Sequence, residues 1–279
     1  MPDLYLMEHP AALLPARSPE LRDLMGLDLR RVARLATGWR PPVVPDQFSV
    51  LLEPQAIGQW LAARPGRAAV DIELGPDRQP DMVGVATGPA EAAILALPNP
   101  VSLAALMDGL RGREVVVHYG EGLEVEWFLE VGGLGWVVDT TIHDLHKLFH
   151  ALDPEYASAG RDKGPGGKRG GGSGALAFIQ SLYSWRPYHK HLLRLATTFA
   201  QKAHYCMLDC VVEWECFTNL LKHIERAAPR SLEAYRRDAV PLLPIMVQMS
   251  LKGLRVDTER FAERKAGLAL EVGSMGEAL

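Results

Sequence analysis

Short apolar runs dominate residues 68–140, whereas apolar residues after 175 recur every three to four positions. The short runs predict strands, and the longer spacing predicts helices. Strands are expected at 68–74, 114–119 and 136–140, with a further pair inside 82–97 joined by the turn Thr87-Gly88-Pro89. Helices are expected at 18–39, 54–63, 102–110, 124–132, 143–152, 175–184 and 191–227, and twice within 240–272 around Gly253.

This order of elements predicts an α/β fold: a mixed sheet flanked by helices, with a helical C-terminal extension. Gly88 at the bend favours a hairpin within 82–97. The Pro-rich segment WRPPVVPDQ breaks helix and marks a boundary near residue 45. We therefore expect a helical and extended region at 1–60, a main domain at 61–228 and a helical region at 229–279.

The charge of the chain limits how it can bind nucleic acid. Its 279 residues are 48% hydrophobic and carry a net charge of −4, so no overall basic field attracts nucleic acid. Such contacts would need bound cations or a local basic patch. The Gly-rich segment 160–174 is basic and cannot bury enough surface to order itself, which predicts an exposed loop. It is either a linker or a loop that contacts phosphates through Arg161, Lys163, Lys168 and Arg169.

The cysteines and the hydropathy pattern bear on the cellular compartment. Cys206, Cys210 and Cys216 are odd in number and lie close together, and no signal peptide is evident, which favours the reducing cytoplasm. His204 lies beside them, but buried thiols on a helix are expected rather than a zinc site. No apolar run reaches the ~18 residues that span a bilayer, so no membrane partner is expected.

Carboxylates supply the candidate chemistry. Asp71 and Glu73 are two apart in an expected strand, so they project from the same side. Such neighbours repel unless a cation lies between them or one carboxylate holds a proton; a lone pair of this kind also occurs where a strand edge meets water. Tyr205 and Asp209, four apart, share one face of an expected helix. Two-metal phosphodiester hydrolysis needs three or four carboxylates around cations ~3.5–4 Å apart.

These features together resemble a known family. The strand VDIEL, the hairpin of 82–97 and the Tyr205-x-x-x-Asp209 spacing are similar to the 3′–5′ proofreading exonuclease domain of family A DNA polymerases. That domain belongs to the Tyr-containing branch of the DEDD superfamily and has a ribonuclease H-like fold. The resemblance covers about residues 65–265, with SLYSWRPYHK similar to phage and organellar-type members. The stretch 242–257 resembles the joint between exonuclease and polymerase.

The resemblance implies hydrolysis of DNA at single-stranded or frayed 3′ ends, using two Mg²⁺ or Mn²⁺ ions, in proofreading during replication. The implied catalytic set is Asp71, Glu73, Glu124, Tyr205 and Asp209, with all but the tyrosine binding metal. The implied nucleic-acid contacts are His118, Tyr119, Lys168, Arg169, Trp185, Tyr188 and Lys190.

The family has three acidic motifs, of which VDIEL resembles the first and Tyr205-x-x-x-Asp209 the third. The second motif, within residues 118–129, departs from the family pattern. Tyr119 replaces an asparagine, and Glu124 replaces an aspartate, with Glu126 as the candidate if the loop differs in length. The longer glutamate moves its carboxylate by about an ångström, and displacement of that size can cost ~100-fold in rate. The first metal position therefore looks intact, while the second is in question.

Two alternatives remain open beside an active DNA exonuclease. One is a ribonuclease D-like exoribonuclease. The other is a weakened exonuclease fold that holds DNA for a polymerase in a separate chain, docked on the apolar helix around Leu242 and Met249. The motifs of a polymerase are not present, so residues 229–279 are expected to be the truncated start of a polymerase-like region. The expected location is the cytoplasm of a bacterial or phage-infected cell.

Overall fold

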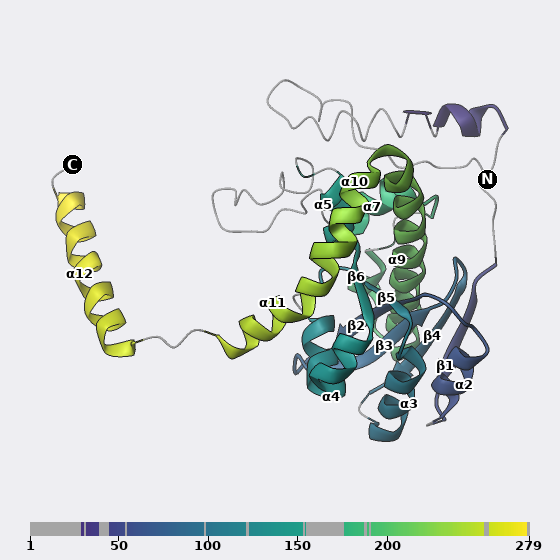
Figure 1. Cartoon of the computed structure of the whole chain (residues 1–279), viewed down its shortest axis with the longest axis horizontal. Coiled ribbons are helices and arrows are strands. Elements are labelled where there is room, and N and C mark those ends of the chain that lie inside the picture. The colour runs from purple at the N-terminus through teal and green to yellow at the C-terminus, as the bar shows by residue number, and fades with distance from the viewer. Residues whose placement is uncertain are drawn as a thin grey trace.

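A computed structural model describes residues 29–30, 32–38, 45–53, 55–97, 99–120, 123–152, 154, 176–186, 189, 191–253 and 257–277. Within this part, six strands form one mixed sheet in the order β1-β4-β3-β2-β5-β6 (Figure 1). Strand β3 runs antiparallel to β2 and β4, whereas β1, β5 and β6 pair in parallel with their neighbours. The strands are β1 (Gln47–Leu51), β2 (Ala68–Leu74), β3 (Pro80–Ala86), β4 (Glu91–Ala96), β5 (Glu114–Val117) and β6 (Thr141–Asp144).

Helices occupy both faces of this sheet, and α9 is the longest of those described. The helices are α2 (Ala56–Ala62), α3 (Pro100–Leu110), α4 (Glu124–Asp139), α5 (Leu145–Leu152), α7 (Leu176–Tyr183), α8 (His191–Leu195), α9 (Phe199–Ala227), α10 (Pro229–Ala234), the π-helical turn η2 (Tyr235–Ala239), α11 (Val240–Lys252) and α12 (Thr258–Glu277). Helix α9 crosses β2, β3 and β4, with α5 and α7 packed beside it, while α11 packs on α4. Figure 1 shows α12 set apart from the sheet.

Alternation along β2 divides its side chains between the two cores. Val70 and Ile72 join the core formed with α3 and α4, whereas Ala69 joins the core under α9. Because strand side chains alternate with period two, Asp71 and Glu73 project toward α9. The predicted ribonuclease H-like mixed sheet flanked by helices, with a helical C-terminal part, is confirmed.

The strand predicted at 136–140 is wrong. Helix α4 continues to Asp139, with a non-helical Gly133 (φ 72°) inside it, and strand β6 starts only at Thr141. Trp136 is buried, and its Nε1–H donates a hydrogen bond to the Met107 carbonyl at 2.8 Å. A short apolar run fits a buried helix as well as a strand, so periodicity alone does not separate them.

Strand β1 is a feature that the sequence did not predict. It lies within the region expected to be helical and extended, and it pairs in parallel with β4, Gln47 opposite Glu91. The hairpin of β3 and β4 is confirmed. Of the helix expected at 18–39, residues 29–30 and 32–36 are helical and most of the others lie outside the described residues, as does the Gly-rich segment 160–174. In the described ranges, no helix is long and apolar enough to cross a membrane.

Helix α11 has one buried face and one exposed face. Leu243 and Val247 are buried in the core beside α4. The exposed side chains along the same helix are Leu242, Ile245, Met246, Met249 and Leu251.

A buried histidine on β6 predicts an acid-sensitive contribution to stability. The His143 ring lies between Phe217 and Tyr235, with centroids 5.0 and 5.9 Å away. Burial disfavours the charged ring and lowers its pKa from 6.5 to about 4, although Glu114 opposes the shift. The unfolded chain therefore binds more protons between these values, so the free energy of unfolding should fall as the pH drops from 6.5 toward 4. One such group changes the slope by at most about 1.4 kcal/mol per pH unit.

His143→Phe keeps a ring of similar size and removes this titration. Denaturant unfolding at pH 4 to 7 should show a shallower acid slope for the variant than for the parent chain. Equal slopes in the two proteins would show that His143 does not titrate in this way.

Candidate metal centre

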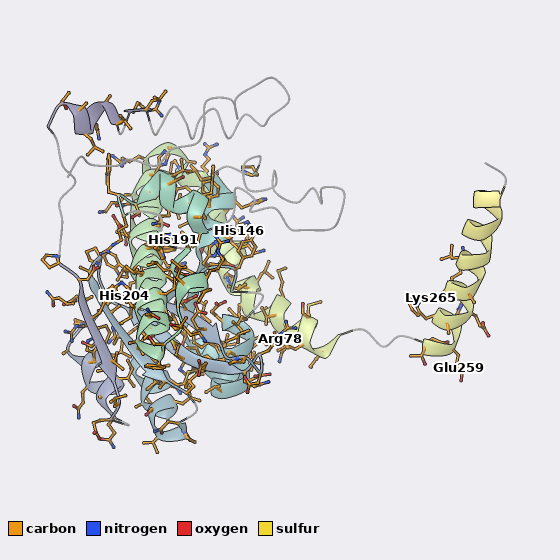
Figure 2. All side chains as sticks on the ribbon, turned by 180° about the vertical axis from the view of Figure 1, so that it is seen from behind. Arg78, His146, His191, His204, Glu259 and Lys265 are labelled. Atoms are coloured by element: carbon orange, nitrogen blue, oxygen red, sulfur yellow. The ribbon has the colours of Figure 1, made fainter. Side chains whose placement is uncertain are left out.

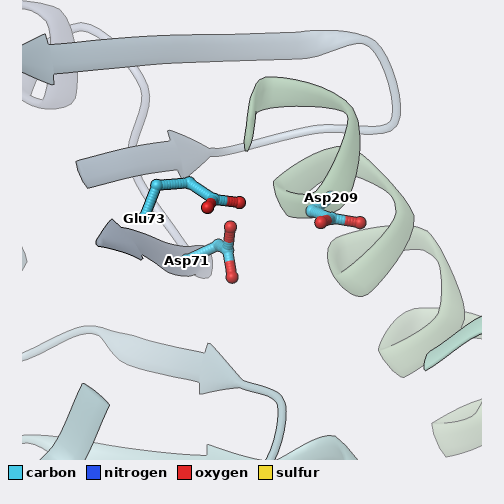
Figure 3. A group of neighbouring side chains, drawn as sticks. All are labelled: Asp71, Glu73 and Asp209. Atoms are coloured by element: carbon cyan, nitrogen blue, oxygen red, sulfur yellow. The ribbon is translucent and has the colours of Figure 1, made fainter. Parts of the chain in front are cut away.

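Three carboxylates gather where β2 faces α9. Asp71 and Glu73 come from β2 and Asp209 from α9, and one oxygen from each lies within 4.8 Å of the others (Figure 3). Asp209 is 2% exposed. Three like charges at this distance repel unless cations or protons intervene. Carboxylate oxygens are the donors that hard cations such as Mg²⁺ and Mn²⁺ prefer, so the residues fit such ions.

A glycine allows α9 to approach the sheet this closely. A Cβ added to Gly84 of β3 would lie 2.6 Å from the Cys210 sulfur and 2.7 Å from the Cys206 sulfur. The Cys206 sulfur is in turn 3.5 Å from Oδ2 of Asp71. The close packing of these thiols on Gly84 thus sets the distance between Asp209 and the carboxylates of β2.

The three cysteines are free and buried, as the sequence predicts. His204 lies on α9 near them in sequence (Figure 2). Its ring packs against that of Phe48, with the centroids 5.5 Å apart. Among the described residues, the group of potential metal ligands within 4.8 Å of one another comprises the three carboxylates and does not include His204.

Tyr205 lies one helical turn before Asp209 on the same face of α9. Its side chain is buried, and burial raises the pKa of the phenol, with the Asp209 charge and a hydrogen bond to Asp209 adding to the shift. The negative charges of Asp71 and Glu73 act in the same direction. The phenol therefore remains protonated and acts as a donor.

His189 is a contact of Asp209 that the sequence did not predict. Its Nε2 lies 2.7 Å from Oδ1 of Asp209, and both groups are buried. The other ring nitrogen, Nδ1, is 3.5 Å from the Gln180 side-chain amide. Twenty residues separate His189 from Asp209 and no periodicity relates them, so only the folded arrangement shows this pair.

Glu124 lies close to the three carboxylates but is not one of that group. It is the first residue of α4 and is 7% exposed. Burial raises its pKa to about 8, and the charges of Asp144 and Glu73 add to that shift. The Glu73 charge thus acts on the Glu124 carboxyl, whereas the group of ligands within 4.8 Å of one another in the described residues leaves Glu124 out.

The loop before Glu124 carries an exposed aromatic ring. Tyr119 has φ 60°, a left-handed conformation that favours glycine or asparagine. Its side chain is 43% exposed, and its ring stacks on that of His146 at 4.2 Å. His118 packs edge-on against the same ring at 4.9 Å. Asp144 holds this loop, because its Oδ2 accepts the Gly120 N–H at 3.1 Å.

Trp185 is the only other predicted nucleic-acid contact that the described residues include, and it is half-buried. Beside it, Arg186 pairs with Asp46 at 2.7 Å. The remaining predicted contacts, Lys168, Arg169, Tyr188 and Lys190, lie outside the described residues.

The sequence matches no protein-family model and no curated protein. Solved structures share its fold. The POL domain of Pol1 from M. smegmatis, in complex with DNA primer-template and dNTP, gives a TM-score of 0.57 at 16% identity over 82% of this chain and 36% of that chain. The catalytic core of RRP6 from Trypanosoma brucei gives 0.52 at 14% identity, over 73% and 53% of the two chains. An apo form of a nuclease gives 0.51 at 18% identity, over 76% and 95%.

The chain therefore spans about a third of the Pol1 chain and about half of the RRP6 chain. Identities this low show a shared fold and nothing finer. That fold is consistent with the ribonuclease H-like fold predicted from the sequence.

Proposed function

We propose that the chain is a metal-dependent 3′–5′ exonuclease that hydrolyses DNA, in the proofreading of replication. The observation that carries this proposal is the gathering of Asp71, Glu73 and Asp209 within 4.8 Å, with Tyr205 one turn before Asp209 on the same helix. The shared exonuclease fold supports it. The 3′ polarity and the preference for DNA follow from the resemblance at VDIEL and Tyr205-x-x-x-Asp209.

In this proposal, water attacks the terminal phosphodiester, the bond between phosphorus and O3′ breaks, and a 5′-mononucleotide leaves. Two divalent cations, Mg²⁺ or Mn²⁺, supply activation of that water and neutralise charge on the phosphate when bound. Asp71, Glu73 and Asp209 hold and space the cations, with Glu124 as the fourth acid. His189 fixes the rotamer of Asp209 through its 2.7 Å contact.

Tyr205 orients the attacking water through its phenolic hydroxyl, which stays protonated. Tyr205→Phe should therefore lower kcat by about 100-fold, the order of loss caused by misplacing a reacting group. Because the pKa of the phenol is raised above its usual 10.0, the variant should change the height of the pH–rate profile and not its shape.

Tyr183→Phe is the matched control, since Tyr183 lies on α7 and its hydroxyl contacts Nδ1 of His223 at 2.8 Å. It should leave kcat unchanged. A Tyr205→Phe variant with the parent rate would remove the tyrosine from the mechanism.

The substrate's 3′ end needs an unpaired base to enter such a site. The exposed Tyr119 ring, backed by His146, offers a face on which a base stacks, and Trp185 is a second candidate. Stacking of this kind is tolerant of sequence and contributes about 1–3 kcal/mol per base.

A weakened exonuclease fold is the second candidate function. The position of Glu124 outside the three-carboxylate group favours it, because a second cation would then bind poorly. The chain would hold DNA for a polymerase carried elsewhere, with the exposed face of α11 toward that partner. An RNA substrate is a third outcome, in keeping with structural neighbours that act on DNA or RNA.

Matched DNA and RNA oligonucleotides distinguish these functions. Each carries a 5′ label, and a second set has a blocked 3′ end. The proposal predicts stepwise shortening of unblocked DNA with Mg²⁺ or Mn²⁺, slower shortening of RNA, and no reaction at blocked ends. Faster shortening of RNA would indicate an exoribonuclease, and binding of DNA without shortening would indicate the holding module.

A further inference from the structure

A fifth carboxylate lies beside the metal centre without an evident structural reason. Glu213 is one helical turn after Asp209 on α9 and is 2% exposed. Its Oε2 has no hydrogen-bond partner among the described residues. A buried carboxylate without partners is costly, and such groups are generally paired or bound to metal.

The surroundings of Glu213 are acidic. The charges that act on it belong to Asp71, Asp209 and Glu124, which lie on β2, α9 and α4, and the Cys210 thiol acts in the same direction. Burial and these like charges raise the pKa of Glu213 well above its usual value. A leucine or glutamine would fill the same space at lower cost, so packing alone does not account for a glutamate here.

The placement of Glu213 also complements that of Glu124. Asp71, Glu73 and Asp209 account for one cation, and Glu124 alone adds a single carboxylate for a second. Glu213 lies one turn from Asp209 on α9, and the charges of both Glu124 and Asp71 act on it. Asp71 is the acid that two neighbouring cations would share. All these donors are carboxylate oxygens, the set that suits Mg²⁺ or Mn²⁺.

We propose that Glu213 is a ligand of the second divalent cation, which binds between Asp71, Glu124 and Glu213. This inference rests on the cation centre of the proposed function. It adds a residue outside the three motifs, supplied from one turn further along α9. Glu213 thereby offsets the altered second motif, in which a glutamate stands where the family has an aspartate.

The test counts bound Mn²⁺ on the folded, full-length chain by the electron paramagnetic resonance of the free ion. The parent chain should bind two ions, and Glu213→Gln, which preserves shape and removes the charge, should bind one. The Hill slope of the Mg²⁺ dependence of hydrolysis should fall from about 2 to about 1. Glu213→Asp keeps the charge but shortens the reach, and should bind two ions with the second at least about tenfold weaker.

Glu225→Gln is the matched control, because Glu225 lies on the same helix and its side chain is 48% exposed. It should bind two ions as the parent does. Circular dichroism verifies that each variant is folded. If Glu213→Gln does not fold, the Mn²⁺ binding of Glu213→Asp decides the test. The inference would be overturned if the parent chain bound fewer than two Mn²⁺ ions. It would also be overturned if the variant that decides bound both ions with the affinity of the parent chain, or lost both ions.

Failure of this inference is distinguishable from failure of the proposed function. Two ions on the parent chain and one on Glu213→Gln, without hydrolysis of any oligonucleotide, would reject the exonuclease and keep the site. Stepwise shortening by a Glu213→Gln chain that still binds two ions would keep the exonuclease and reject Glu213 as a ligand.

Discussion

Asp71→Asn should lower the rate of 3′-end shortening by about 1,000-fold, because Asp71 is expected to contact both cations. Metal ions contribute several kcal/mol of transition-state stabilisation, and ~4 kcal/mol corresponds to this factor. The same substitution should stabilise the metal-free chain by on the order of 1 kcal/mol, since it removes one of three like charges held within 4.8 Å.

A loss of activity together with a gain in metal-free stability identifies Asp71 as a metal ligand, because substitution of a merely structural residue lowers both activity and stability. Rates follow from single-turnover assays, and stability follows from denaturant unfolding in chelator. Asp108→Asn, an exposed change on α3, is the control and should alter neither. An Asp71→Asn chain that keeps a tenth of the parental rate would exclude Asp71 from the centre.

Gly84→Ala should impair activity without touching any candidate ligand. The new Cβ would lie 2.6 Å from the Cys210 sulfur and 2.7 Å from the Cys206 sulfur, so α9 must move away from β3. Overpacking of this kind costs about 1–3 kcal/mol of stability. A shift of about an ångström between Asp209 and Asp71 should lower the rate of hydrolysis by ~100-fold.

Removing the obstructing sulfurs tests that cause. In the triple variant Gly84→Ala, Cys206→Ala, Cys210→Ala, removal of the two sulfurs makes room for the new Cβ. The triple variant should therefore recover most of the rate that Gly84→Ala loses. The Cys206→Ala, Cys210→Ala double variant is the control for the effect of the sulfurs themselves. Full activity in Gly84→Ala alone would show that the close approach of α9 does not set the geometry of the site.

Local periodicity was sufficient to place the carboxylates of β2 and the face of α9. Asp71 and Glu73 share a side because strands alternate, and Tyr205 and Asp209 share a face because helices repeat near four residues. The boundary between α4 and β6 was misplaced because WVV fits either element. Strand β1 was missed because its pairing with β4 lies far along the chain.

The neighbours of the site were harder to predict for the same reason. His189 meets Asp209 only through packing between elements, and no spacing in the sequence relates the two residues. Glu213 even lies one turn from Asp209, but an acid on a long helix ordinarily faces water. Its burial, visible only in the folded chain, is what sets it apart.

Metal-dependent hydrolysis from the 3′ end is tested with a 5′-labelled single-stranded DNA oligonucleotide and the purified chain in Mg²⁺, in chelator, and after Mg²⁺ is restored. A metal-dependent 3′–5′ exonuclease should produce a ladder that shortens one nucleotide at a time from the 3′ end, stops in chelator and resumes when Mg²⁺ returns. Shortening that continues in chelator, internal cleavage, or an intact oligonucleotide beside a folded chain that binds Mn²⁺ would contradict this function.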